Sequence, residues 1–271
     1  MTVPTLDVLL PRSQSPRRLE PRADEAELVA LLDDGPAGER EHAGRSLVVR
    51  ANMISTLDGA ATGPDHVSGS INGAADLRVF QALRAVADVV LVGAGTVRAE
   101  GYGSLDVPPR LEGTRRARGR VAPPELAVIT RSGDLPAALL DARRPPLVVT
   151  TAANPHVDAL RGRVGGQRVV VAGEHEVDLV VTLRALVDRG LTSVLAEGGP
   201  SLLAELVARD LVDDLFLTWS PTLVGGPAPR VLDGGPWLAP PREATLVHLL
   251  HADGVLLGRW SLRRPRSHES H

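Results

Sequence analysis

Two glycine-containing junctions, each directly after an apolar run, carry the strongest chemical signal in this sequence. The first is Gly93-Ala94-Gly95-Thr96-Val97-Arg98 and the second is Glu197-Gly198-Gly199-Pro200-Ser201-Leu202. Glycine lets a ligand approach the backbone closely, and a helix start presents unpaired N–H groups to an anion. Two such junctions in one chain favour a single ligand that contacts both, and a dinucleotide pyrophosphate fits. The alternative is two tight turns that only begin helices.

A third segment offers groups that bind phosphate. In Ile129-Thr130-Arg131-Ser132-Gly133, a guanidinium and a hydroxyl follow an apolar run. Both groups donate hydrogen bonds to phosphate, so Arg131 and Ser132 are predicted to hold a ribose 2′-phosphate. An exposed turn is the alternative. The first junction is not a Rossmann fingerprint, because that pattern needs a third glycine where this chain has Arg98.

Apolar patterning predicts the elements that position these segments. Short β-branched runs predict strands at 47–54, 88–92, 126–130, 146–151, 169–171, 193–196, 215–219, 244–250 and 255–262. Helical spacing and capping residues predict helices at 73–87, from 154 onward, at 177–190 and at 202–209. This order predicts an α/β fold with a mostly parallel central sheet, helices on both faces and antiparallel C-terminal strands.

The chain divides into three parts by composition. Residues 1–45 are expected to form an N-terminal arm laid over the domain, 46–262 the main domain, and 263–271 a disordered tail. Residues 110–120 hold five arginines and are expected to form a solvated loop.

Composition excludes several kinds of chemistry. The chain has no cysteine, and all 30 of its cationic side chains are arginine. Thiolate catalysis, cysteine-ligated zinc, iron–sulfur clusters and lysine Schiff bases are therefore excluded. A net charge of −3 gives no argument for a nucleic-acid partner, and no apolar run reaches the length of a membrane span. We expect a cytoplasmic protein without a metal site.

A fourth segment, Asn52 to Gly63, leaves a buried strand and enters an Asp-Gly turn at Asp58. This segment, Leu83-Arg84-Ala85, the first junction and Glu197-Gly198-Gly199-Pro200 occur in the order of the pyrimidine reductase domain of riboflavin biosynthesis. Further matching runs lie at 211–215 and 220–226. The chain resembles that family over residues 46–262 and looks like an actinobacterial stand-alone member.

The resemblance implies a dihydrofolate-reductase-like fold, NADPH as hydride donor and a homodimer. It also implies reduction of a ribosyl group to ribityl, as in a 5-amino-6-(5-phosphoribosylamino)uracil reductase. Many members carry a zinc deaminase domain as well. That domain needs a P-C-x-x-C motif, which this cysteine-free chain lacks.

The resemblance also assigns roles to residues. It implies that the cofactor contacts Ser55, Gly93, Ala94, Gly95, Thr96, Val97, Gly198, Gly199, Pro200, Ser201 and Leu202, with Arg131 and Ser132 at the 2′-phosphate. The implied catalytic residues are Glu197, beside the nicotinamide, and Asp76, whose carboxylate would accept two parallel hydrogen bonds from the substrate ring. Asp76 could instead serve the helix dipole. Asn52 and Asp58 are expected at the substrate, with a turn role as the alternative for Asp58.

The sequence departs from the family in two places. The family has a lysine shortly before its Leu-Asp-Gly turn, where the nearest cation here is Arg50. The family also grips substrate phosphate with a Leu-Thr-x-Arg run, where this chain has Glu100-Gly101-Tyr102-Gly103-Ser104-Leu105. Arg78 and Arg98 are the predicted replacements for that grip.

Together these features predict an NADPH-dependent reductase of a C=N bond. Hydride attacks the carbon and a proton reaches the nitrogen, from Glu197, from Asp76 or from water. Two alternatives stay open: a reductase of dihydrofolate or another pterin, and a non-catalytic NADP(H)-binding sensor.

Overall fold

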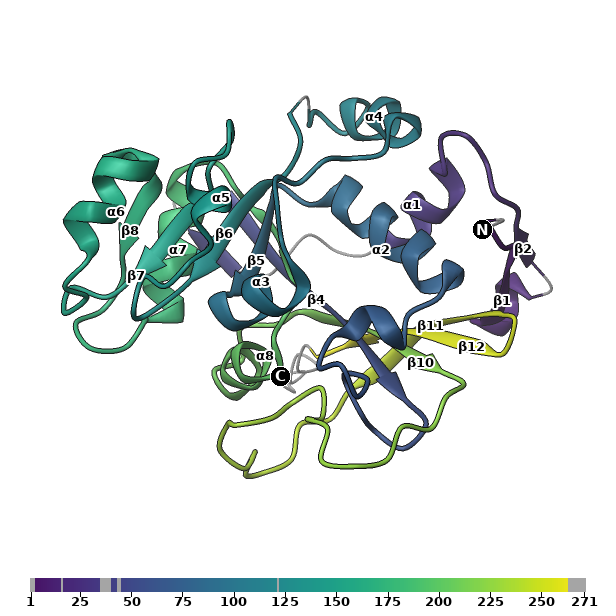
Figure 1. Ribbon diagram of the computed structural model, residues 1–271. Coiled ribbons are helices and arrows are strands. Elements are labelled where there is room, and N and C mark those ends of the chain that lie inside the picture. The colour runs from purple at the N-terminus through teal and green to yellow at the C-terminus, as the bar shows by residue number, and fades with distance from the viewer. Residues whose placement is uncertain (1–2, 16, 35–39, 43–44, 121, 263–271) are drawn as a thin grey trace, which may run out of the picture.

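The computed structural model describes residues 3–15, 17–34, 40–42, 45–120 and 122–262 (Figure 1). Its centre is one twelve-stranded sheet. From edge to edge run β2 (Arg17–Leu19), β1 (Leu6–Leu10), β11 (Thr245–Ala252), β12 (Val255–Ser261), β10 (Asp214–Ser220), β4 (Arg45–Thr56), β9 (Ser193–Ala196), β5 (Val89–Gly93), β6 (Glu125–Ile129), β7 (Leu147–Thr150) and β8 (Val169–Val171), while β3 (Arg40–His42) pairs with β4. Strands β10 to β8 in this order are parallel, and the others pair antiparallel.

Helices cover both faces of the sheet, because each must bury its apolar stripe. On one face pack α1 (Ala26–Asp33), α2 (Ala74–Val86), α3 (Ala94–Glu100), α5 (Ala137–Leu140) and α6 (Val157–Val164). On the other pack α7 (Leu179–Asp188) and α8 (Pro200–Ala208). The predicted α/β fold with a mostly parallel central sheet and antiparallel C-terminal strands is confirmed. In the described part of the chain, no helix is long and apolar enough to cross a bilayer.

The helix expected from Asn154 begins later, at Val157. The side chain of Asn154 explains the delay. Its Oδ1 accepts the N–H of His156 at 2.9 Å, and its amide donates to the Thr150 hydroxyl at 2.8 Å. These bonds hold a turn at the end of β7 before the helix starts.

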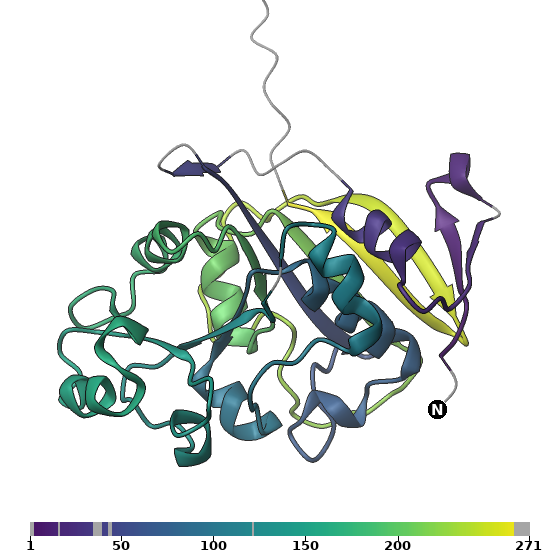
Figure 2. The same ribbon diagram turned by 90° about the horizontal axis from the view of Figure 1, so that it is seen from above.

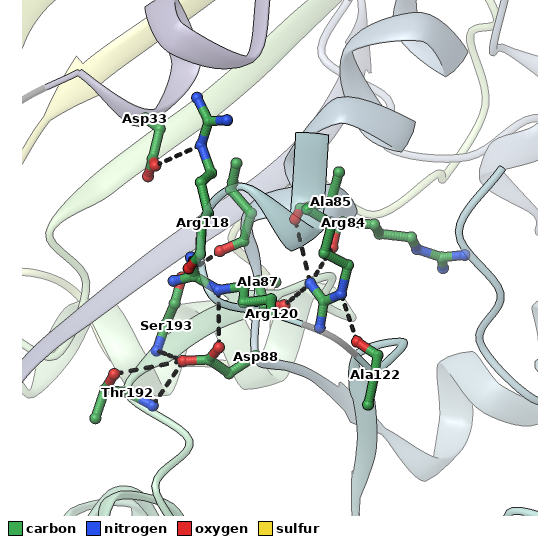
Figure 3. Close-up of polar contacts among 12 residues, drawn as sticks. Asp33, Arg84, Ala85, Ala87, Asp88, Arg118, Arg120, Ala122, Thr192 and Ser193 are labelled. Carbon is green, nitrogen blue, oxygen red and sulfur yellow. Dashed lines mark hydrogen bonds and ion pairs between the residues drawn. The ribbon is translucent and has the colours of Figure 1, made fainter. Parts of the chain in front are cut away.

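The arginine-rich stretch at 110–120 is not the solvated loop that we expected. It contains α4 (Pro109–Arg116), and Arg115 is buried. The Arg115 guanidinium donates to the carbonyls of Ala87 and Ala122, both at 2.5 Å. Figure 3 shows Arg118 reaching Asp33 at 3.3 Å and Arg120 reaching Asp88 at 2.8 Å. Arg115, Arg118 and Arg120 therefore bind backbone carbonyls and carboxylates instead of being surrounded by water.

The described N-terminal residues extend the sheet. Strand β1 pairs antiparallel with β11, and α1 packs beside α2 (Figure 2). Arg78 of α2 fixes this segment through two hydrogen bonds to the Glu25 carboxylate, at 2.6 and 3.0 Å. The same guanidinium donates to the backbone carbonyls of Pro4, Leu19 and Glu20. The expected tail at 263–271 lies outside the described residues.

Candidate active site

The two glycine junctions lie side by side at the carboxyl edge of the sheet. Strands β5 and β9 are parallel neighbours, and each leads directly into its junction. The N–H of Gly93 donates to the carbonyl of Gly198 at 2.9 Å. A Cβ atom on Gly199 would lie 2.7 Å from the Thr96 hydroxyl oxygen, so the two junctions pack closely at this point. The two segments therefore form one surface.

Two hollows open along this edge. The first, which we call the cleft, has a volume of about 520 Å³ and lies between α2 and the two junctions. The second, which we call the cationic hollow, has a volume of about 640 Å³ and adjoins the end of β6. It is lined by Ala94, Gly95, Arg98, Ile129, Thr130, Arg131, Ser132 and His175. Gly95 lines both hollows, so one extended ligand can occupy the two together.

Glu197 is the most heavily bonded side chain in the cleft. Its carboxylate is only 2% exposed. Arg84 donates from Nε to Oε1 and from Nη2 to Oε2, each at 2.7 Å, and the Tyr102 hydroxyl donates to Oε2 at 2.7 Å. The Arg84 guanidinium also lies over the Phe80 ring, 4.1 Å from its centre. Such charge-assisted bonds are strong, so the carboxylate is fixed in one orientation.

Asp76 is the second buried carboxyl group of the cleft. Asp76, Phe80 and Arg84 are four residues apart along α2 and so share one helix face. The Thr218 hydroxyl of β10 donates to Asp76 Oδ1 at 2.5 Å. Burial raises the pKa of Asp76 to about 6, although the Thr218 hydrogen bond acts to lower it. A carboxyl group with this pKa can donate a proton near neutral pH.

Most residues predicted from the sequence come together at this edge. The cleft is lined by Asn52, Asp76, Gly95, Thr96, Glu197, Gly199 and Pro200. The cationic hollow is lined by Ala94, Arg98, Arg131 and Ser132. Six predicted cofactor residues line neither hollow: Ser55, Gly93, Val97, Gly198, Ser201 and Leu202. Val97 is fully buried, and the Ser55 hydroxyl donates to the neighbouring carbonyl of Thr56.

Three predicted substrate residues lie elsewhere. Arg78 is buried against the N-terminal segment and does not line the cleft. Asp58 accepts the N–H groups of Val224 and Gly225 at 3.1 and 2.6 Å. It therefore joins two loops, which agrees with the turn role that was the alternative to a substrate role. Arg98 lines the cationic hollow and donates to the Asp134 carbonyl at 2.7 Å. Neither Arg78 nor Arg98, the two residues predicted to hold the substrate phosphate, lines the cleft.

Sequence reasoning missed the roles of Arg84, Tyr102 and Thr218. Arg84 could have been found from its spacing of eight residues from Asp76 on one helix face. Tyr102 is the only tyrosine in the chain, in the segment that departs from the family. Thr218 lies 142 residues from Asp76, and no local pattern links them.

The fold and this cleft together define an α/β protein with a carboxyl-lined ligand cleft at the carboxyl edge of its sheet. A family model described as the RibD C-terminal domain matches residues 48–257, and the chain belongs to that family. The predicted family resemblance and enzyme class are confirmed.

Related proteins support this assignment. A 2,5-diamino-6-ribosylamino-4(3H)-pyrimidinone 5′-phosphate reductase of Archaeoglobus fulgidus is 29% identical over 70% of this chain and 88% of that protein. The protein of the same name from Methanothermobacter thermautotrophicus is 33% identical over 68% of this chain and 82% of that protein. A solved pyrimidine reductase-like protein of Corynebacterium diphtheriae is 26% identical, with a TM-score of 0.69 over 81% of this chain and 93% of that one.

Titration of the single tyrosine tests the geometry around Glu197. Burial, followed by the adjacent Glu197 charge, raises the pKa of Tyr102 well above 10.0. We expect tyrosinate absorbance to stay absent at pH 10 and to emerge only when circular dichroism shows unfolding. Glu197→Gln should lower this pKa, because it removes the neighbouring negative charge. Half-ionisation near pH 10 in the folded protein would contradict the hydrogen bond.

Proposed function

We propose that this protein reduces a ribosylamino-pyrimidine with NADPH. The observation that carries this proposal is the continuous edge on which a carboxyl-lined cleft adjoins a cationic hollow at Gly95. The pyrimidinone phosphate reductases named above support the choice of substrate ring. An α/β sheet also binds its ligands outside the carboxyl ends of its strands, where this edge lies.

The residues present fit NADPH. At Gly95, which lines both hollows, a Cβ atom would meet no other protein atom within 4 Å, so a ligand can approach the backbone closely there. In the cationic hollow, Arg98, Arg131 and Ser132 offer donors for a 2′-phosphate. When bound, NADPH supplies a hydride ion to the substrate carbon. The protein supplies orientation and a site for the proton.

Within the cleft, Asp76 and Glu197 have different proposed roles. Both oxygens of Glu197 already accept hydrogen bonds from Arg84 and Tyr102, so its carboxylate acts as a fixed acceptor for the substrate. Asp76 uses Oδ1 for Thr218 and lines the cleft with the rest of its carboxyl group. Asp76 is the proposed proton donor to the substrate nitrogen.

NADPH oxidation, followed by absorbance, tests the function. A ribosylamino-pyrimidine should be turned over, and Asp76→Asn should lower kcat at least about 100-fold, the loss of a general acid. Asp158→Asn, at a 95% exposed side chain on α6, is the matched control. The buried Asp76 carboxyl also suits a pterin, so dihydrofolate is assayed in parallel. Turnover of dihydrofolate alone would replace the proposed function with that of a pterin reductase. NADPH binding without turnover of either compound would favour a non-catalytic NADP(H)-binding sensor.

The pH dependence tests the proton donor separately. Because the pKa of Asp76 is raised to about 6, its proton is present below that pH and is lost above it. The log of kcat/KM should therefore fall with pH above about 6, with a slope near −1. An activity that rises through pH 6 would assign the proton to another group.

Cofactor titrations test the cationic hollow. Arg131→Gln and Arg98→Gln should each weaken NADPH binding by about tenfold or more and leave NADH binding unchanged, since only NADPH carries the 2′-phosphate. Arg161→Gln removes an exposed arginine of α6 and serves as the control. Equal losses for both cofactors would show that these arginines do not contact the 2′-phosphate.

We also propose that the protein forms a homodimer. Side chains that alternate along β10, β11 and β12 give one sheet face a half-buried apolar surface, made of Leu215, Leu217, Trp219, Leu246, Leu249, Leu256 and Trp260. An apolar surface of this kind is typical of an interface between subunits. The biosynthetic reductases among its relatives support a cytoplasmic location as part of this proposal.

Sedimentation equilibrium tests the dimer. The wild type should have twice the mass of one chain, and Leu256→Arg should have the mass of one chain, because a buried charge opposes association. Val180→Arg, at an exposed position of α7, is the control. A wild-type monomer at all concentrations would exclude the dimer.

A further inference from the structure

The cleft carries an excess of negative charge. Among the described residues that line it, Asp76, Glu100 and Glu197 are acidic, and Arg84 is the only arginine. Glu197 engages Arg84 with both of its oxygens. His66 lies at the exposed rim of the cleft. The described lining therefore offers no unpaired guanidinium to a second anion.

The segment that departs from the family forms one wall of this cleft. Glu100 is the last residue of α3, and its Oε1 accepts the N–H of Ser68 at 2.6 Å. Two residues later, the Tyr102 hydroxyl is committed to Glu197. An acidic side chain and a phenol thus line the wall formed by the segment that replaces the family's phosphate-gripping run.

The cations expected to replace that run are also committed elsewhere. Arg78 bonds Glu25 on the arm side of α2. Arg98 lines the cationic hollow together with Arg131 and His175. The two hollows therefore have opposite electrostatic character. Phosphate donors gather in the cationic hollow, and carboxylates gather in the cleft.

We propose that the cleft selects an unphosphorylated ribosylamino-pyrimidine over its 5′-phosphate. This inference rests on the proposed function and deepens it. A phosphate monoester carries close to two negative charges at pH 7. In a partly desolvated cleft, like charges repel more strongly than in water, and unpaired anions are rejected. A ribose hydroxyl, in contrast, can donate hydrogen bonds to carboxylates such as Glu100.

Steady-state kinetics with the matched pair of substrates tests this selection. We expect kcat/KM to be at least about tenfold higher for the ribosylamino-pyrimidine than for its 5′-phosphate. Equal values, or a preference for the phosphate, would overturn the inference and leave the proposed function intact. Turnover of neither compound, with NADPH binding retained, would overturn the proposed function itself.

A charge variant tests the cause of the preference. Glu100→Gln keeps an acceptor for the Ser68 N–H and removes one negative charge from the wall. The preference for the unphosphorylated substrate should narrow by about threefold or more. Asp158→Asn removes the same charge far from the cleft and should leave the ratio of the two kcat/KM values unchanged. An unchanged ratio in Glu100→Gln would overturn the electrostatic explanation.

Discussion

A carboxylate buried at the end of β9 is the constraint on which the site depends. A charge this deep is tolerated only when it is paired and hydrogen-bonded. Glu197 therefore needs Arg84 from α2 and Tyr102 from the segment after α3, both at 2.7 Å. These bonds join three elements that are far apart in the chain. They also determine how far α2 stands from the glycine junctions, and so the width of the cleft.

The same pairing explains why the edge of the sheet has two electrostatic environments. Arg84 is engaged by Glu197, so it does not offset Asp76 and Glu100. Across Gly95, Arg98 and Arg131 form ion pairs with the exposed acids Asp134 and Glu176, at 3.4 and 3.3 Å. An exposed pair is weak and can exchange its partner for phosphate. A buried pair cannot exchange its partner in this way, because one charge would then remain buried without a partner.

Local patterns in the sequence were sufficient to predict the core of the fold and the edge of the sheet at which the candidate cleft lies. The β-branched runs of β5 and β9 and the apolar spacing of α2 are short-range signals, and the junctions follow from them. The contacts of the arginines were harder to predict, because their partners are backbone carbonyls and acids that lie far away in the sequence. Arg115 was expected in a solvated loop and Arg78 at the substrate phosphate, yet both are buried and bonded to backbone carbonyls. No local pattern identifies such partners.

The two ends of the long sheet have a consequence for assembly. Its outermost strands, β2 and β8, have only three residues each, and β2 carries Arg17 and Arg18. Edge strands this short offer few free backbone groups for a further strand to pair with, and the two arginines of β2 add charge at one of the edges. The sheet therefore resists end-to-end polymerisation into fibres. Contacts between folded copies through a face of the sheet would leave its carboxyl edge accessible to small molecules.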